Sequence, residues 1–406
     1  MSRFTYFFYW ILFFPNILWD AISGYFILTS SQLSFLSQLI KMILLLFFIT
    51  ISLKKRNFSL IIFNVFIFGF LSSYINVFIN SEFKSIFTYQ LPLLAKILFN
   101  ILAFMAINQL YQKGYLKLSD ISRCLTFSYW VVVVNVSLGL AGYGYNTYQH
   151  IEGGFKGYFV AGNELSSLFF ILSTYMLVRT IIINGFNYKF LLYSILTIMV
   201  STLIGTKTSL FISIFSVWFI FSLYLLSQSY LISLSLINIM MLLIITTAIL
   251  YFNISSFFEL MLERITYSYS NFGLLGVLFN GRELFIEDFF NKIIYSNSFS
   301  SILFGLGAVN PSTGEQFKMV EMDFFDIFMY FGLPYALLIL FLHLVLIYKS
   351  YYQTKDFFCK YAILFVNSFL LLISLFVGHV WYSAMIGISW ASLNLFIIKI
   401  EGRNCL

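Results

Sequence analysis

The chain has 406 residues, of which 61% are hydrophobic and 10% are charged, and its mean hydropathy is +0.92. Soluble domains carry about 25% charged residues, so this composition excludes a soluble globular protein. The net charge of +7 does not indicate nucleic-acid binding, because the Lys and Arg residues are spread over short segments between apolar runs, as membrane topology requires.

Apolar runs that could cross a bilayer follow one another along the chain. A spanning helix needs about 20 mostly apolar residues, and about twelve runs come close to or reach that length. The predicted spans are 4–19, 32–53, 58–79, 88–109, 124–142, 160–183, 189–205, 207–227, 231–253, 324–348, 358–378 and 380–398. The sequence therefore predicts an all-α polytopic membrane protein, with residues 1–406 as a single integral membrane domain.

The positions of the basic residues predict the orientation of this domain. If the N-terminus lies inside, most Lys and Arg residues fall on the inner side, as the positive-inside rule requires. They are Arg3, Lys54, Lys55, Arg56, Lys113, Lys117, Arg123, Arg179, Lys189, Lys349, Lys355, Lys360, Lys399 and Arg403. Both termini are therefore predicted to be cytoplasmic.

Two polar segments are predicted on the outer side, at 143–159 and 254–323. The second is by far the longest polar stretch, and a connection of that length in a compact protein is usually functional. Within it, residues 281–295 have Phe and Ile at helical spacing. The sequence therefore predicts one large periplasmic loop that contains short helices.

Ionisable and polar residues at the ends of the predicted spans are candidates for a site, because they are costly at membrane depth. By the predicted topology they all lie at the outer face, beside the long loop. They are Asn163 and Glu164 in 160–183, Lys207 as the first residue of 207–227, Asp323 just before and Asp326 in the first turn of 324–348, and His379 just before 380–398. Structural interpretations stay open, such as the helix macrodipole for Asp323, snorkelling for Lys207 and an interfacial belt for His379.

The long loop adds charges that suit group transfer. Arginine binds phosphate through a planar fork, so Arg264, Arg282 and Lys207 on one face would form a basic pocket for a diphosphate. A carboxylate that accepts a proton from a hydroxyl would complete such a site. The candidates for that base are Glu321, Asp323 and Asp326. No metal site is predicted, because the three cysteines form no CxxC pair.

Four short motifs occur in a fixed order over about residues 155–395. They are Gly157-Tyr158-Phe159 leading to Asn163-Glu164, then Gly205-Thr206-Lys207, then Asn280-Gly281-Arg282, and finally Gly305-Leu306-Gly307 followed by Glu321-Met322-Asp323 and Gly332. Together with the predicted topology, they resemble the bacterial O-antigen polymerase and ligase superfamily. The chain resembles the Wzy-type polymerases more than the lipid A-core ligases.

The resemblance implies a function at the periplasmic face of the bacterial inner membrane. Members of this superfamily transfer a glycan from undecaprenyl diphosphate to an acceptor hydroxyl without a metal or cofactor. The chain is therefore expected to be an inverting glycosyltransferase that polymerises oligosaccharide repeat units. Its expected partners are the undecaprenyl-diphosphate-linked glycan and the lipid bilayer, with a chain-length regulator protein as a further partner and no nucleic acid.

The resemblance also implies roles for individual residues. Glu321, Asp323 and Arg282 are the catalytic candidates. The substrate-binding candidates are Lys207, Arg264, Asn163, Glu164, Asp326 and His379. Lys207 departs from the family pattern, which has an arginine there, and a lysine keeps the charge but loses the bidentate fork.

Two other functions stay open. An O-antigen ligase would use a lipid A-core acceptor, but the ligase branch has a histidine where this chain has Glu321-Met322-Asp323. A lipid-linked oligosaccharide flippase or other secondary transporter belongs to a different class and predicts charged residues at mid-membrane and broken helices. In this sequence the charges collect at the outer ends of the spans, and Lys41 and Lys96 are interpreted as snorkelling side chains.

Overall fold

A computed structural model of the protein describes residues 8–53, 56–80, 86–147, 154–228, 266–267, 269–271, 273, 282–296, 299–308, 317 and 319–400. The predicted span 231–253 and the candidate residue Arg264 lie outside these residues. Both remain predictions.

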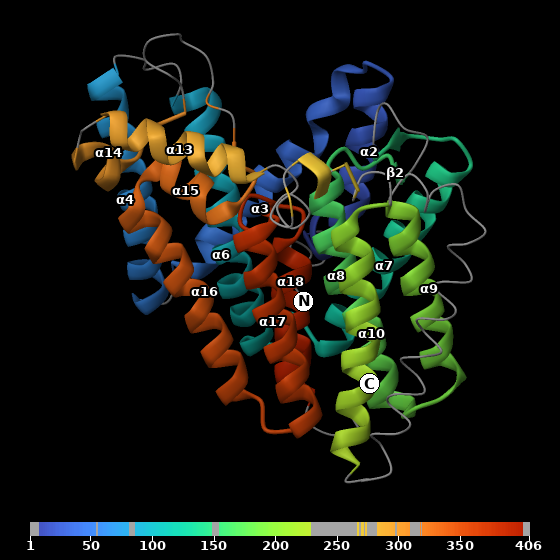
Figure 1. Ribbon diagram of the computed structural model, residues 1–406. Coiled ribbons are helices and arrows are strands. Elements are labelled where there is room, and N and C mark those ends of the chain that lie inside the picture. The colour runs from blue at the N-terminus through green and yellow to red at the C-terminus, as the bar shows by residue number, and fades with distance from the viewer. Residues whose placement is uncertain are drawn as a thin grey trace.

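The described residues form an all-α bundle (Figure 1). Its helices are η1 (Phe8–Phe13), α2 (Asn16–Leu28), η2 (Gln32–Phe35), α3 (Leu36–Ser52), α4 (Arg56–Asn80), η3 (Ile86–Gln90), α6 (Leu91–Gln112), α7 (Leu118–Leu140), α8 (Gly162–Asn184), α9 (Tyr188–Ile204), α10 (Lys207–Ser227), α13 (Arg282–Ser296), α14 (Phe299–Phe304), α15 (Asp323–Phe331), α16 (Leu333–Gln353), α17 (Phe357–Phe376) and α18 (Gly387–Lys399).

Within the described part of the chain, seven helices are long and apolar enough to cross a membrane. They are Gln32–Ser52, Thr88–Gln112, Leu118–Leu140, Gly162–Asn184, Lys207–Ser227, Leu333–Gln353 and Phe357–Phe376. Large apolar side chains on the outer helices face away from the protein, as at Leu46, Phe63 and Phe341. An apolar exterior suits lipid better than water, so the fold is consistent with a polytopic protein of the lipid bilayer. The count of about twelve spans and their orientation stay predictions.

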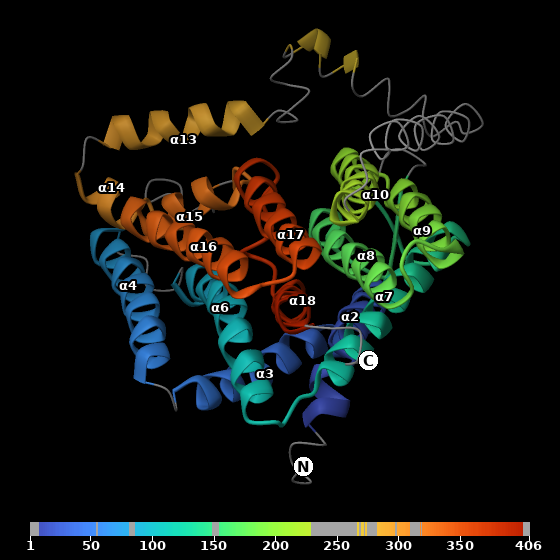
Figure 2. The same cartoon turned by 90° about the horizontal axis from the view of Figure 1, so that it is seen from below.

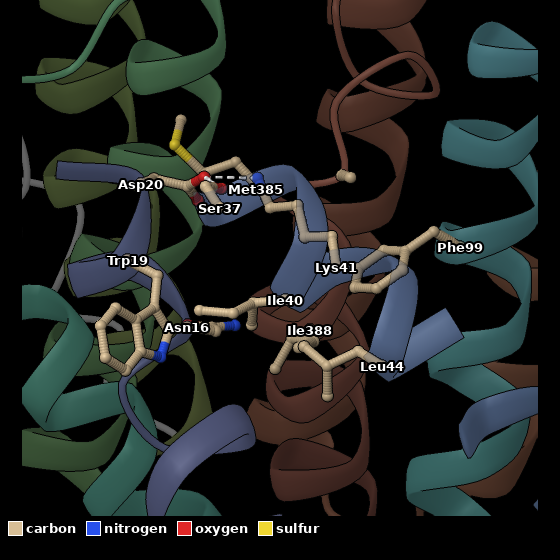
Figure 3. A pocket seen from close by; sticks show the side chains of 11 residues that line it. Asn16, Trp19, Asp20, Ser37, Ile40, Lys41, Leu44, Phe99, Met385 and Ile388 are labelled. Carbon is tan, nitrogen blue, oxygen red and sulfur yellow. Dashed lines mark hydrogen bonds and ion pairs between the residues drawn. The ribbon is translucent and has the colours of Figure 1, made fainter. Parts of the chain in front are cut away.

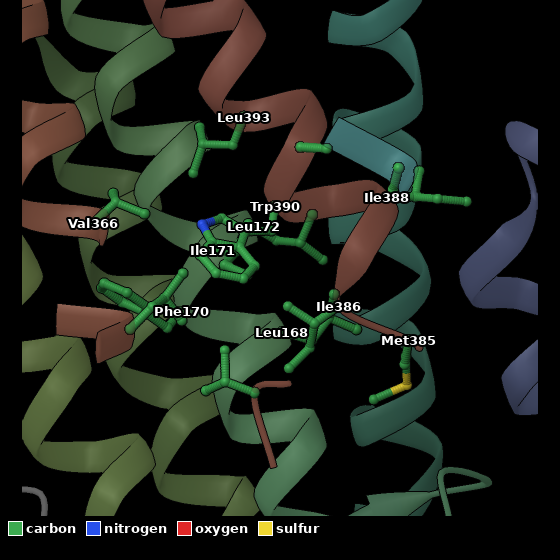
Figure 4. Close-up of a cluster of buried hydrophobic side chains, with 14 of the residues drawn as sticks. Leu168, Phe170, Ile171, Leu172, Val366, Met385, Ile386, Ile388, Trp390 and Leu393 are labelled. Carbon is green, nitrogen blue, oxygen red and sulfur yellow. The ribbon is translucent and has the colours of Figure 1, made fainter. Parts of the chain in front are cut away.

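α8 and α18 form the centre of the bundle. α8 is buried nearly all round, and α18 packs against α6, α7, α8 and α17 (Figure 2). A helix that is apolar on every side is expected at such a position. Leu168, Phe170 and Leu172 of α8 lie in one cluster with Trp390 and Leu393 of α18 (Figure 4).

Three predicted spans are interrupted in the structure. Pro15 separates η1 from α2, because proline has no N–H to continue the helical ladder. Gly332, at φ 88°, divides α15 from α16, and a Cβ atom there would lie 2.0 Å from the Leu303 carbonyl oxygen. The span expected over 380–398 is helical only in α18. Residues 377–386, here called the connecting segment, join α17 to α18 without regular helix.

One end of the bundle, here called the α13 end, is the end at which α13 and α14 lie (Figure 1). The helix predicted over 281–295 is observed as α13 and lies across this end. Its Phe289 contacts Phe325 and Phe328 of α15. The predicted loop 143–159 instead contains a two-stranded antiparallel sheet, β1 (Tyr145–Asn146) and β2 (Phe155–Gly157), at the same end.

Candidate functional site

The connecting segment is mostly buried although it is not helical, so its backbone polar groups need partners within the protein. Asp323 supplies them from the first turn of α15. Its Oδ1 accepts a hydrogen bond from the backbone N–H of His379 at 2.7 Å, and its Oδ2 accepts from those of Val380 and Trp381, each at 2.9 Å. The hydroxyl of Ser374 donates to the same Oδ2 at 2.9 Å. The Asp323 carboxylate therefore accepts from three backbone N–H groups of the connecting segment and from the Ser374 hydroxyl of α17, and these bonds fix the segment.

Two further helices hold the connecting segment through polar side chains. Nδ2 of Asn100, in α6, donates to the carbonyl oxygens of Val380 at 3.1 Å and Trp381 at 2.9 Å. The hydroxyl of Ser383 donates to Oε2 of Glu164, in the first turn of α8, at 2.9 Å. The structure thus brings Glu164, Asp323 and His379 to one segment, although they are far apart in sequence.

An ion pair lies beside the start of the connecting segment. Nη2 of Arg282, the first residue of α13, lies 3.0 Å from Oε2 of Glu321. Nη1 of Arg282 donates to the carbonyl oxygen of Phe376, the last residue of α17, at 3.3 Å. The Arg282 side chain is 11% exposed and that of Glu321 is 52% exposed. A cation at a helix C-terminus is electrostatically favourable, so both contacts stabilise this position of the guanidinium.

The backbone of Glu321 packs directly on the connecting segment. Gly378 has φ 73°, and a Cβ atom there would lie 2.3 Å from the Glu321 carbonyl oxygen, so only glycine fits. Glu321 itself has φ 64° and His379 has φ 63°. Left-handed backbone is uncommon for residues other than glycine and is often found at functional sites. The ion pair and the connecting segment therefore form one unit.

The three candidate bases differ in the hydrogen bonds that their carboxylates accept and in their exposure to solvent. Asp326 accepts hydrogen bonds from the backbone N–H groups of Val320 at 2.7 Å and Met322 at 3.1 Å, and it is 2% exposed. Asp323 is 1% exposed and has the four donors described above. Among these three acids, only Glu321 has an exposed side chain.

Lys207 lies at the start of α10, which is tied to α8. The Thr206 hydroxyl caps α10 by accepting from the Ser209 N–H at 3.0 Å, and it lies 2.8 Å from the Ser166 hydroxyl. Ser166 is two residues beyond Glu164 in α8. The start of α10 is therefore held close to the first turn of α8.

Other polar groups lie at the start of α8. The carbonyl oxygen of Asn163 accepts from the Ser167 hydroxyl at 3.2 Å. Lys156, in β2, donates to the carbonyl oxygen of Val160 at 2.7 Å, and burial lowers the pKa of its ammonium group. Burial raises the pKa of Tyr145 in the adjacent strand. Lys156 was not a candidate in the sequence because a lysine in a polar segment carries no distinctive signal.

Sequence reasoning also missed Asn100, Ser374, Ser383 and Gly378. Asn100 had a usable signal, because it is an amide inside the apolar run 88–109 and a buried amide needs partners. The other three show no pattern that separates them from ordinary residues at span ends. Their contacts depend on the path of the connecting segment, which requires the tertiary structure.

Among the described residues, no group of three or more His, Cys, Asp or Glu side chains lies close enough to hold a metal ion. No protein-family model matches the chain, and neither does any curated protein or solved structure. The chemistry of the site is therefore inferred from its own residues.

Proposed function

We propose that the chain is a membrane glycosyltransferase that polymerises undecaprenyl-diphosphate-linked oligosaccharide repeat units at the periplasmic face of the bacterial inner membrane. The observation that carries this proposal is the Arg282–Glu321 pair, 3.0 Å apart at the α13 end of the bundle. A guanidinium that can bind a diphosphate lies in contact with an exposed carboxylate that can accept a proton. These are the two groups that an inverting glycosyl transfer requires.

The proposed reaction has one displacement step. Glu321 takes the proton of the acceptor hydroxyl while that oxygen forms a bond to the anomeric carbon of the donor sugar. The bond from this carbon to the diphosphate oxygen breaks, and its electron pair leaves with the diphosphate. Arg282 stabilises the charge on the departing diphosphate, with Lys207 as a second cation. The configuration at the anomeric carbon is inverted because attack and departure occur on opposite faces.

The Arg282–Glu321 ion pair supports a particular order of events in the proposed reaction. An arriving diphosphate competes with Glu321 for the planar fork of Arg282, because both are anionic oxygen ligands. Binding of the donor therefore frees the carboxylate to act as the base. Glu321 is favoured as the base over Asp323 and Asp326, since their oxygens already accept buried backbone hydrogen bonds.

Asp323 acts in this proposal as a positioning residue. It fixes the connecting segment, and that segment in turn supports the backbone of Glu321 through Gly378. Glu164 supports the other part of the segment through Ser383. Asn163, Asp326 and His379 lie in or beside these elements, and Arg264 stays a prediction outside the described residues.

The Arg282→Ala variant tests the proposal through the amount and length of polymer in cells that express it. The gene is deleted, the variant is expressed in its place, and surface glycan is separated by gel electrophoresis. We expect loss of long polymer with Arg282→Ala and normal polymer with Lys292→Ala, whose side chain pairs with Asp288 elsewhere on α13. Unchanged polymer length and amount in Arg282→Ala would contradict the assignment. In the deletion strain, single repeat units on the core indicate a polymerase, whereas bare core indicates an O-antigen ligase.

One observation favours a transporter as the second candidate. Lys41 forms an ion pair with Asp20 inside the α2–α3 hairpin, and Pro15 interrupts the helix just before it. Charged groups within the membrane and broken helices are typical of secondary transporters. Purified protein that extends lipid-linked repeat units in vitro supports the polymerase. Protein that only moves them across a liposome membrane supports the transporter.

A further inference from the structure

The turn between α16 and α17 is rich in lysine and aromatic side chains. Residues 348–361, here called the basic turn, contain Lys349, Lys355, Lys360, Tyr348, Tyr351, Tyr352, Phe357, Phe358 and Tyr361. Since α16 runs from the α13 end to the opposite end of the bundle, the basic turn lies far from the Arg282–Glu321 pair (Figure 1). None of its residues has a part in the proposed glycosyl transfer.

The positive charges of the basic turn are not compensated by acids. None of its three lysines forms an ion pair with another described residue, whereas Lys41 of α3 pairs with Asp20 of α2 at 2.5 Å (Figure 3). The one acid in the turn is Asp356, which accepts a hydrogen bond from the Cys359 N–H at 2.8 Å and so caps α17. Three lysines and one acid leave the turn with a net charge of +2. The turn therefore favours an anionic partner.

Aromatic rings hold one of these lysines in place. Nζ of Lys360 lies 4.0 Å from the centre of the Tyr351 ring. The Tyr351 ring in turn lies 5.3 Å from that of Tyr352 and 6.2 Å from that of Tyr361, measured between centroids. A cation–π contact orders an ammonium group without neutralising its charge. Lys360 is thus positioned and still able to bind an anion.

An apolar stripe on α16 leads to the basic turn. Its side chains recur every three or four residues, which places them on one face of the helix, and each is between 47% and 65% exposed. They are Leu337, Phe341, Leu344, Tyr348 and Tyr352. The stripe is about 22 Å long at 1.5 Å per residue, which exceeds the ~15 Å hydrocarbon depth of one leaflet. It can therefore accommodate a whole acyl chain.

The stripe and the basic turn together define the chemistry of a partner. A soluble anion would match the lysines but leave the stripe uncovered. A neutral or zwitterionic lipid would match the stripe but would not compensate the charge of the lysines. An anionic phospholipid matches both, and basic segments beside membrane spans bind such headgroups.

We propose that an anionic phospholipid binds along α16, with an acyl chain on the stripe and its phosphate at Lys349, Lys355 and Lys360. It belongs to the leaflet at the end of the bundle opposite the α13 end, which the predicted orientation makes the cytoplasmic leaflet. The hydroxyls of Tyr348 and Tyr352 then lie at the level of the headgroups, where tyrosines are enriched. The test measures binding, so its outcome does not depend on the glycosyl transfer.

Competition between two lipids tests the proposal. The full-length protein in detergent is incubated with equal amounts of phosphatidylglycerol and phosphatidylcholine that have the same acyl chains, and the bound lipids are identified by native mass spectrometry. Each basic side chain near an anionic headgroup strengthens binding about fivefold, so we expect phosphatidylglycerol to be retained about 10-fold or more over phosphatidylcholine. Equal retention of the two lipids would overturn the proposal.

Variants locate the binding on the protein. Lys349→Gln combined with Lys355→Gln should bring the two lipids to nearly equal retention, because both side chains are exposed and lose their charge. The matched control, Lys113→Gln with Lys189→Gln, removes two exposed charges from other turns and should keep the preference. If the first double variant lacks a monodisperse gel-filtration peak, Lys355→Glu, between the two helices, replaces it. An unchanged preference in a folded basic-turn variant, or an equal loss in the control, rejects this site.

Two further outcomes would assign the surface to another occupant. Glycerol 3-phosphate carries the charged group without acyl chains, so at millimolar concentration it should not displace phosphatidylglycerol. Displacement would show that the phosphate alone is bound and would contradict a lipid site. A lipid-free dimer in the mass spectrum would assign the stripe to a second copy of the chain and would also contradict the proposal.

Discussion

Oδ2 of Asp323 accepts a hydrogen bond from the backbone N–H of Trp381 at 2.9 Å, although 58 residues separate the two in the chain. The bond joins the first turn of α15 to the connecting segment that precedes α18. It belongs to a set of four donors on one carboxylate, which is why a non-helical stretch can be buried among helices. The candidate site depends on this arrangement.

Asp323→Asn should destabilise the protein strongly. The amide offers one acceptor oxygen in place of two, and its NH2 group would face backbone N–H donors. Hydrogen bonds to charged groups contribute about 1.5–3 kcal/mol each, so we expect a loss of at least ~2 kcal/mol. The measurement is the temperature at which the purified protein loses its monodisperse gel-filtration peak. Asp288→Asn, at an exposed carboxylate of α13, is the control and should shift little. Equal shifts would contradict the role of Asp323.

Gly378→Ala should disable the site without unfolding the protein. The new methyl group would lie 2.3 Å from the Glu321 carbonyl oxygen, so Glu321 has to move and its pairing with Arg282 is lost. We expect polymer to disappear in the whole-cell glycan gel while the protein is still inserted. Gly114→Ala is the matched control, because Gly114 has a similar φ of 71° with nothing within 4 Å. That variant should lose only about 1 kcal/mol of stability through backbone strain, and cells that express it should make the normal amount of polymer. Normal polymer in Gly378→Ala would show that this contact is not required.

Glu321→Gln should reduce the rate of repeat-unit addition by about 10²-fold or more, because a positioned base contributes 10²–10⁴-fold to such reactions. The rate is measured with purified protein and lipid-linked repeat units. Binding of the lipid-linked donor should persist, since Arg282 keeps its charge and loses its anionic competitor. Glu287→Gln, at a carboxylate of α13, serves as the control. A Glu321→Gln rate within a few-fold of the parent rate would exclude this carboxylate as the base.

Asn100→Ala should destabilise the connecting segment from the α6 side. The carbonyl oxygens of Val380 and Trp381 would lose a donor in a buried environment, which costs about 1–3 kcal/mol. Thermal unfolding followed by gel filtration measures the effect. Asn108→Ala removes an amide from the same helix whose Oδ1 accepts from Gln112 at 3.3 Å in an exposed contact. A larger shift in Asn108→Ala than in Asn100→Ala would contradict the proposed support.

The sequence predicted regular helices well and their interruptions poorly. The span 207–227 coincides with α10, and 189–205 differs from α9 by one residue at each end, because Asn187, Gly205 and Thr206 are clear end signals. The run 380–398 has the composition of a span throughout. Its first part is nevertheless not helical, since Asp323 and Asn100 provide partners for its backbone. Hydropathy averages over a window and does not contain these long-range bonds.

The candidate residues were predicted unevenly. Glu164, Asp323 and His379 could be assigned to one level of the bundle from topology, and the structure brings them to one segment. Which acid is free to react could not be predicted, because it depends on the backbone donors around each carboxylate. Lys41 was interpreted as a snorkelling side chain, but it forms an ion pair with Asp20. Such a pairing depends on how α2 packs on α3, so the local sequence around either residue does not predict it.

The side chains that hold the connecting segment all come before it in the chain, and this order has a consequence for biogenesis. Asn100, Glu164 and Asp323 are all synthesised before the connecting segment that they hold. The ribosome therefore delivers every anchor first, and the segment docks only after α17 has left the exit tunnel. A chain that stopped shortly after residue 376 would contain Asn100, Glu164 and Asp323 without the segment that they hold, so these buried polar side chains would lack their partners.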